Sequence, residues 1–218
     1  MKTKWCIAAM WLLALLPLAL VAVLYARLPD QVPMHWGIDG AVNRYGGKNE
    51  LWLMGALGPV LALLLQFLPR LDPKKRNYER FHTYYEAAAL VIMAFLAVVM
   101  GVVLVECFRP GTLSVGRVVS ALAGLLFLFL GNLMGKVKPN FFLGIRTPWT
   151  ISDPDVWNRT HRLGGGLFFL TGLVTVVSAI LLPEPVTFAV LMAGTLLTAL
   201  IPTVMSYLWY RRRTGGGA

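Results

Sequence analysis

The sequence predicts an all-α polytopic membrane protein with six transmembrane helices. Of its 218 residues, 57% are hydrophobic and 14% are charged, whereas soluble domains have about 45–50% apolar and about 25% charged residues. Six stretches are apolar over the roughly 20 residues that a helix needs to cross a bilayer. The basic residues also divide unevenly between the loops. These observations exclude a soluble or disordered chain, and two cysteines are too few for a disulfide framework.

The six predicted spans cover residues 5–26, 51–68, 87–108, 114–134, 164–182 and 187–209. The first follows Lys2 and Lys4 and therefore resembles a secretory signal peptide. Its apolar core is longer than the about 7–15 residues of a signal peptide, and Leu24 is too large for the cleavage motif. We therefore expect an uncleaved helix. The GxxxG spacing of Gly131 and Gly135 permits close helix packing.

The charge of the loops predicts that both termini lie in the cytoplasm. Fifteen of the 20 Lys and Arg residues lie in the N-terminus, the segments 69–86 and 135–163, and the C-terminal tail, and five lie on the other side. Lys and Arg accumulate in cytoplasmic loops, and an even number of spans returns the chain to its starting side. The net charge of +10 thus indicates topology and contact with anionic membrane lipids, and we expect no direct binding of nucleic acid.

The pattern of the loops predicts two three-helix halves, residues 1–108 and 109–218. WGIDGAVNRYGG in the first outer loop and WTISDPDVWNRTHRLGG in an inner loop share Trp, Ile, Asp, Val, Asn-Arg and a Gly pair in order. Each segment follows the first span of its half. Because three is an odd number of spans, a duplication would give halves of opposite topology, as in many transporters. The similarity leaves two interpretations open, a chance match and a 3+3 inverted repeat.

The first outer loop, residues 28–50, is predicted to fold just outside the membrane. Its prolines exclude a helix at the start, and its glycines mark turns. The loop lacks HExxH or paired-histidine spacing, so a peptide-contacting surface is favoured over a metal site, and we expect no metal or cofactor. The candidate binding residues of this loop are His35, Trp36, Asp39 and Lys48.

A short helix is predicted in the second half of the inner loop, residues 131–166. Ser152 is a suitable N-cap, and the glycines 164–166 would end the helix or form a hinge into the fifth span. Val156, Trp157 and Thr160 share one face, which predicts a helix that lies on the inner leaflet.

The first half of this inner loop, KPNFFLGIRTPW, alternates aromatic side chains with basic and amide side chains. A helix that merely seats the loop against lipid does not require this alternation, which indicates a docking surface. The candidate binding residues of the whole inner loop are Lys138, Asn140, Arg146, Thr147, Trp149, Trp157, Arg159, His161 and Arg162. We interpret the other inner loop, residues 69–86, as an interfacial helix with Tyr78, Tyr84 and Tyr85 in the aromatic belt.

Both motif loops resemble a known family. GNLMGKVKPNFFLGIRTPWTISDPDVWNRTHRLGG resembles the signature of the SdpI family of bacterial toxin-immunity membrane proteins. LPDQVPMHWGIDGAVNRYGGK is similar to the uncharacterised module at the N-terminus of many members. The resemblance implies a multi-pass protein of the bacterial plasma membrane that protects against a secreted peptide toxin. It also implies a second partner, a small DNA-binding autorepressor that is held at the membrane, and it supplies no catalytic residues.

We therefore expect a binding and signalling protein of the immunity class rather than an enzyme. A small transporter or exporter of a peptide or lipid is the alternative, and the predicted inverted repeat is the feature that supports it. A membrane-embedded enzyme is the third possibility. It is disfavoured because no nucleophile and base are suitably spaced and because polar residues inside the spans are few, chiefly Gln66, Glu106 and Asn132.

Overall fold

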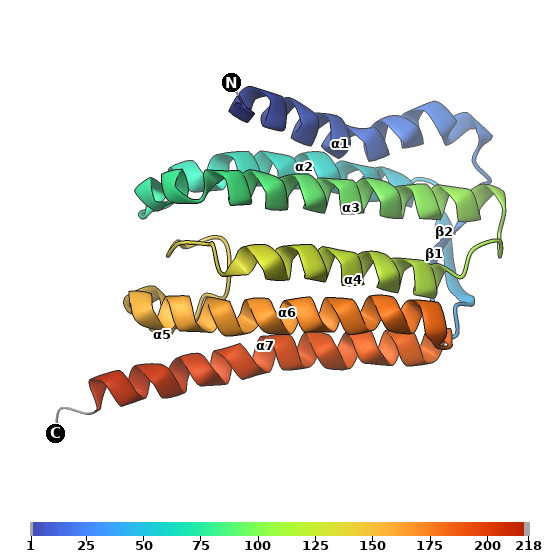
Figure 1. Cartoon of the computed structure of the whole chain (residues 1–218). Coiled ribbons are helices and arrows are strands. Elements are labelled where there is room, and N and C mark those ends of the chain that lie inside the picture. Colours follow the sequence, from blue (N-terminus) through green and yellow to red (C-terminus); the bar gives the residue numbers. More distant parts are fainter. Residues whose placement is uncertain (1, 216–218) are drawn as a thin grey trace.

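The computed structural model describes residues 2–215, in which six long helices run side by side (Figure 1). Each of the six is long and apolar enough to cross a membrane, which confirms the predicted all-α polytopic fold. They are α1 (Lys2–Leu24), α2 (Glu50–Leu71), α3 (His82–Phe108), α4 (Val115–Met134), α6 (Pro154–Leu181) and α7 (Glu184–Thr214).

Short elements occupy the two ends of this bundle. At one end β1 (Gln31–Trp36) and β2 (Val42–Gly47) pair as an antiparallel hairpin after the 3₁₀ turn η1 (Tyr25–Arg27). The opposite end carries η2 (Lys75–Arg80) and α5 (Pro148–Ser152), together with the start of α1 and the end of α7 (Figure 1). We call these the hairpin end and the loop end. Their assignment to outside and cytoplasm, from the loop charges, stays a prediction.

Helix α6 differs from its prediction in two ways. It begins at Pro154 and continues without interruption through the glycines 164–166 to Leu181, so the predicted short helix and the fifth span are one element. Its N-cap is Asp153, whose carboxylate accepts hydrogen bonds from the backbone N–H groups of Asp155 and Val156 at 2.8 and 3.2 Å. Ser152 instead donates to carbonyl groups of α5. Asp153 rather than Ser152 is the N-cap because its side chain reaches two free N–H groups of the first turn.

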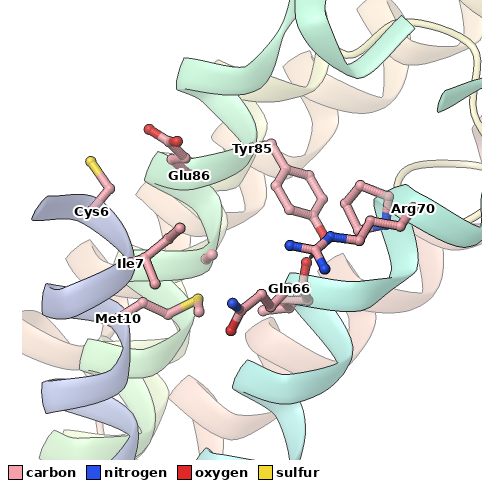
Figure 2. Close-up of a pocket in the computed structure, with 10 residues that line it drawn as sticks. Cys6, Ile7, Met10, Gln66, Arg70, Tyr85 and Glu86 are labelled. Atoms are coloured by element: carbon pink, nitrogen blue, oxygen red, sulfur yellow. Dashed lines mark hydrogen bonds between the residues drawn. The ribbon is translucent and has the colours of Figure 1, made fainter. Parts of the chain in front are cut away.

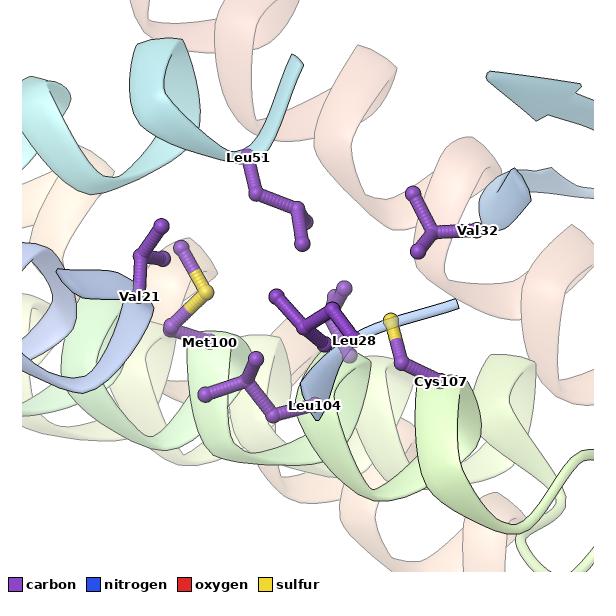
Figure 3. Close-up of a cluster of buried hydrophobic side chains, with 8 residues drawn as sticks. Val21, Leu28, Val32, Leu51, Met100, Leu104 and Cys107 are labelled. Carbon is purple, nitrogen blue, oxygen red and sulfur yellow. The ribbon is translucent and has the colours of Figure 1, made fainter. Parts of the chain in front are cut away.

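The first three spans pack through apolar side chains and through one close contact between α1 and α2, where a Cβ on Gly58 would lie 2.5 Å from the carbonyl oxygen of Ala14. Two buried clusters fill the space between α1, α2 and α3. One centres on Met93 and Ala14, and the other joins Val21, Leu51 and Met100 near the hairpin end (Figure 3). Burial inside the protein here depends on filling space with side chains, as in a soluble core.

The last three spans pack through glycine and hydroxyl groups. A Cβ on Gly131 of α4 would lie 2.5 Å from the backbone nitrogen of Phe169, and one on Gly124 would lie 2.9 Å from the carbonyl oxygen of Gly172. The backbones of α4 and α6 can therefore approach closely. Between α6 and α7, the Thr171 and Thr198 hydroxyls are 3.0 Å apart. Further buried hydroxyls of these spans are Ser120, Thr175, Ser178, Thr187 and Ser206.

The two sets of helices differ in which helix is central. Helix α1 packs extensively on both α2 and α3, whereas in the second set α6 packs on both α4 and α7. The motif loops lie at opposite ends of the bundle (Figure 1), and their Asn-Arg pairs lie in a strand at 43–44 and in a helix at 158–159. The 3+3 inverted repeat stays a prediction.

Contact between the two sets is concentrated at α3 with α4. Along this boundary, an apolar groove of about 350 Å³ runs between the middle parts of the two helices. The loops make the remaining connections, one at each end of the bundle. Both loop connections include residues that the family resemblance singled out, and they define the candidate site regions.

Candidate functional site

At the loop end, the two inner loops are joined by hydrogen bonds that we call the latch. Its centre is Asp72, 2% exposed, directly after α2. One carboxylate oxygen accepts from the hydroxyl of Tyr78 at 3.0 Å and from the backbone N–H of Phe141 at 2.8 Å. The side chain of Asn77 donates to the Pro139 carbonyl oxygen at 2.7 Å, and Lys74 donates to that of Ile151 at 3.0 Å. The latch thus fixes the motif loop against the preceding inner loop.

Asn140 organises the motif loop itself. Its side-chain oxygen accepts from the backbone N–H groups of Phe142 and Leu143 at 2.9 and 2.6 Å and from the hydroxyl of Tyr78. Its amide nitrogen donates to the carbonyl groups of Lys138 and Leu143. Burial, together with the hydrogen bond to Asp72, raises the pKa of Tyr78 above its ordinary value. Tyr78 therefore stays a hydrogen-bond donor at physiological pH.

The start of α6 supports the loop from beneath. Trp157 is fully buried and donates its indole N–H to the Val137 carbonyl oxygen at 2.9 Å. Its ring stacks on His161 with centroids 4.0 Å apart. The Nε2 atom of His161 accepts from the backbone N–H of Ile145 at 3.0 Å, so the proton lies on Nδ1, which donates to the Trp157 carbonyl oxygen. Gly144 has φ +105° and packs against this ring, where a Cβ would clash.

These contacts correct two expectations. Val156, Trp157 and Thr160 are all 0% exposed, so this face of α6 packs on protein and does not lie on the inner leaflet. The loop 69–86 places Tyr78 inside the protein rather than in an aromatic belt, because the Asp72 carboxylate and the Asn140 amide hold its hydroxyl.

The nine candidate residues of the inner loop divide by exposure. Asn140, Thr147, Trp157 and His161 are buried and build the loop from inside. Thr147 caps α5 and lies 3.0 Å from the Ser206 hydroxyl. The remaining five are exposed or partly exposed and are the members that a partner can reach: Lys138, Arg146, Trp149, Arg159 and Arg162.

Two of these exposed residues are positioned by neighbours. The guanidinium of Arg146 donates to the Phe141 carbonyl oxygen at 2.6 Å, and Trp149 packs against Tyr207 of α7 with ring centroids 5.1 Å apart. The Arg159 and Arg162 side chains extend from α6 one turn apart and are exposed. The candidates that a partner can reach are therefore mainly basic, and the one aromatic side chain among them is held in place by Tyr207.

At the hairpin end, the hairpin begins on the first set of helices. Val32 is 0% exposed and packs with Leu28, Leu51 and Cys107 (Figure 3). The strands pair from Gln31 with Gly47 to Trp36 with Val42. This places the hairpin across the end of the bundle (Figure 1), toward the second set of helices.

The hairpin tip reaches the loop between α6 and α7. Asp39 closes its turn by accepting from the backbone N–H of Ala41 at 3.1 Å. Gly40 has φ +77°, and a Cβ there would lie 2.7 Å from the carboxylate of Glu184. Glu184 also accepts from the backbone N–H of Arg117 at 3.2 Å. Glycine is thus required at position 40 by both its backbone conformation and its neighbour.

A cleft of about 560 Å³ lies beneath the hairpin and is bounded by the hairpin, α4 and α7. Two predicted residues line it, His35, which lies 2.6 Å from Asn43, and Trp36. Asp39 is not part of the lining, and neither is Lys48, which pairs with Asp30 at 2.9 Å. The side chains that α4 and α7 contribute are Val115, Val119, Ser120, Phe188, Leu191 and Met192.

Sequence reasoning missed the α4 and α7 side of this cleft and the centre of the latch. Val119 and Met192 are apolar residues within apolar spans, and nothing in the pattern separates a cleft wall from a lipid-facing surface. Asp72 did carry a signal, because it is a lone carboxylate at the end of a span, followed by Pro73 in a basic loop. Within residues 2–215, no three His, Cys, Asp or Glu residues are grouped so that they could hold a metal ion.

Comparison with known proteins agrees with both motif loops. Residues 136–206 match the model of the SdpI/YfhL protein family, and residues 12–58 match a domain of unknown function, DUF1648. The chain is also similar to a protein named Immunity protein SdpI from Bacillus subtilis (strain 168). The identity is 20% over 193 residues, which cover 88% of this chain and 90% of that protein. No solved structure matches the chain.

The family match spans the motif loop from residue 136, α6 and most of α7, and the DUF1648 match spans the second half of α1, the hairpin and the start of α2. Both regions that the sequence singled out are therefore shared with known proteins, in the order expected. The chain is a multi-pass bacterial membrane protein that is similar to the SdpI/YfhL family over residues 136–206, with a region similar to DUF1648 preceding it.

Proposed function

We propose that the protein confers immunity to a secreted peptide toxin and that it binds the toxin in the cleft at the hairpin end. The name of the similar Bacillus subtilis protein supports the immunity role. The cleft supports the binding mode, because the hairpin of the predicted outer loop forms a concave surface there together with two transmembrane helices.

The chemistry of the cleft suits an amphipathic peptide. Apolar side chains of α4 and α7 form one wall, and the hairpin adds the His35 and Asn43 side chains to an otherwise apolar rim. Ligand sites of this kind combine a mostly apolar lining with a few polar groups that orient the ligand. Membrane-active peptides present one apolar and one polar face, which matches this division.

The proposal requires the hairpin end to face outward, as the loop charges predict. A cysteine introduced at Asp39 should react with a membrane-impermeant maleimide added to intact cells, and one introduced at Asp155 should not. Both positions are exposed in the structure, so access to reagent decides the result. Equal labelling at the two positions from outside would overturn the orientation.

A killing assay tests the function and the cleft together. Cells with and without the protein are challenged with a panel of secreted membrane-active peptides, and protection against at least one is expected. Met192→Trp places a large ring in the cleft and should abolish protection. Leu196→Trp lies one turn further along α7, is 61% exposed outside the cleft, and should keep it. Protection by both variants would exclude the cleft, and no protection by the wild type would exclude the immunity role for that panel.

We further propose that the loop end contacts a cytoplasmic protein, with a small repressor as the partner that the family resemblance implies. The supporting observation is that the loop candidates which are not buried are four basic residues and Trp149, whose ring is held against Tyr207. Truncation of an interface anchor costs about 2 kcal/mol or more. Arg146→Ala and Trp149→Ala should therefore leave insertion and expression unchanged while weakening protection or recruitment, and full activity of both variants would exclude this surface.

A further inference from the structure

A second cavity lies at the loop end, between the first three helices and far from the cleft. It is a slot of about 210 Å³ between α1, α2 and α3. Figure 2 shows that Ile7 and Met10 of α1 form one side and that Gln66, Arg70 and Tyr85 face them. Neither the proposed toxin cleft nor the proposed protein-binding surface uses these residues.

The slot opens next to a basic pocket. Pro69 and Arg70 line both cavities, and the basic pocket adds Lys75, Arg76 and a single carboxylate, Glu79. Its volume is about 440 Å³. An apolar slot that is continuous with a cationic pocket, at the end of transmembrane helices, has the shape of an acyl chain joined to a head group.

The cations of this pocket are not neutralised by the protein. Among residues 4–215, the basic residues that form ion pairs are Arg44, Lys48 and Arg213. Arg70 instead lies over the ring of Phe67, with its guanidinium carbon 5.2 Å from the ring centroid. Three cations against one carboxylate leave a net positive pocket, which favours a ligand whose head group is net negative.

The slot also contains an oriented polar group. The side-chain oxygen of Gln66 accepts from the indole N–H of Trp11 at 2.8 Å, which leaves the amide nitrogen to donate. Figure 2 shows this amide pointing into the space between α1 and α2, with the Glu86 carboxylate on the opposite rim from Arg70. A donor just below the cations suits the ester oxygens of a glycerolipid.

We propose that this is a specific binding site for an anionic phospholipid. Its phosphate is held by Arg70, Lys75 and Arg76, its glycerol ester accepts from Gln66, and one acyl chain lies in the slot beside α1. The lipid would fill the space between α1 and the other two helices of its set at the end where that set carries the latch. The site is independent of the proposed toxin cleft.

The test uses the full-length protein in a mild detergent and compares phosphatidylglycerol with phosphatidylcholine of the same acyl chains. Native mass spectrometry should show retained phosphatidylglycerol adducts, and the thermal unfolding midpoint should rise by several degrees with phosphatidylglycerol only. Arg70→Gln combined with Arg76→Gln should lower adduct retention at least tenfold. Arg211→Gln combined with Arg212→Gln removes the same charge from exposed positions of α7 at the same end and should leave retention unchanged.

Two further arms keep the result unambiguous. Lys75→Gln with Arg76→Gln leaves the transmembrane helices unchanged and replaces the first variant if that one unfolds. Ile7→Trp narrows the slot and should also lower retention. Glycerol 3-phosphate at millimolar concentration should not reproduce the thermal shift. Equal retention of both lipids, retention unaffected by the pocket and slot variants, or an equal shift with glycerol 3-phosphate would each overturn the proposal.

Discussion

The first and last three helices of this protein are held together by different chemistry. In α1–α3, clusters around large apolar side chains such as Met93, Met100 and Leu51 fill the interior, and a close backbone approach occurs where Gly58 of α2 meets Ala14 of α1. In α4, α6 and α7, the buried contacts are glycine against backbone and hydroxyl against hydroxyl or carbonyl oxygen. The first set combines clusters of large side chains with one close glycine contact, whereas the second depends mainly on the small-residue and hydroxyl contacts that are common between membrane helices.

The two sets meet along a boundary with few contacts between helices. Each set is internally close-packed, whereas the boundary between them depends on α3 with α4 and on the loops at the two ends. The toxin cleft that we propose lies on this boundary at the hairpin end, and the latch closes the boundary at the loop end. The two motif regions are thus the connections between two differently built units.

The largest effect is expected where a side chain is forced between the backbones of α4 and α6. Gly131→Leu should lower the free energy of unfolding by about 3 kcal/mol, because a Cβ alone would lie 2.5 Å from the backbone nitrogen of Phe169. Gly135→Leu is the matched control, since a Cβ there would meet nothing within 4 Å. Unfolding in mixed micelles measures both, and equal stability of the two variants would contradict the close approach.

The first set, α1–α3, should lose stability when a large buried side chain is removed. Met93 is fully buried in the cluster with Ala14 and Ala62, so Met93→Ala leaves a cavity and should cost about 2–3 kcal/mol. Val98 of the same helix is 48% exposed. Val98→Ala therefore serves as the control and should cost less than about 1 kcal/mol. A similar loss in the two variants would show that side-chain packing does not hold this set together.

The latch should show a smaller and more local effect. Asp72→Asn replaces a carboxylate oxygen that accepts two hydrogen bonds and should cost about 2 kcal/mol. Amide hydrogen exchange at Phe141 should become faster, while exchange in the hairpin should not change. Glu79→Gln, an exposed carboxylate of the same loop, should have no effect, and unchanged exchange at Phe141 in Asp72→Asn would exclude the latch.

The smallest effect is expected for a single hydroxyl pair. Thr171→Val removes the contact with Thr198 and should cost about 0.6 kcal/mol, the average for hydrogen bonds between membrane helices. Thr203→Val removes a hydroxyl that bonds only to a carbonyl group of its own helix and should cost less. Double-mutant cycles between positions 171 and 198 measure the interaction energy of the pair directly. A coupling energy of zero would show that this hydroxyl contact does not stabilise the packing of α6 on α7.

The fold was predictable from the sequence to the level of spans, because apolar length and loop charge are one-dimensional signals. The strand pairing of the hairpin and the continuity of α6 were not. The glycines 164–166 are a break signal in water, but here Gly165 packs against α4, so tertiary contact favours a continuous helix. The central positions of α1 and α6 likewise depend on contacts that no periodicity expresses.

The residues of the candidate site in the two motif loops were predictable from the sequence, but their roles as buried or accessible residues were not. The motif loops have unusual residues for their position, so His35, Trp36 and Arg146 were identifiable. The sequence could not separate residues that build a loop, such as Asn140 and His161, from residues that a partner can reach. Exposure decides between these roles, and it is a property of the folded chain.

The central claim is that a toxin occupies the cleft where the hairpin meets α4 and α7. A photoreactive benzoylphenylalanine introduced at Met192 or at Leu196 tests it directly, using a tagged form of a panel peptide against which the cells are protected. The account predicts a crosslink to the peptide from position 192 and none from position 196. Crosslinks from position 196 alone, or equal yields from both positions, would contradict it.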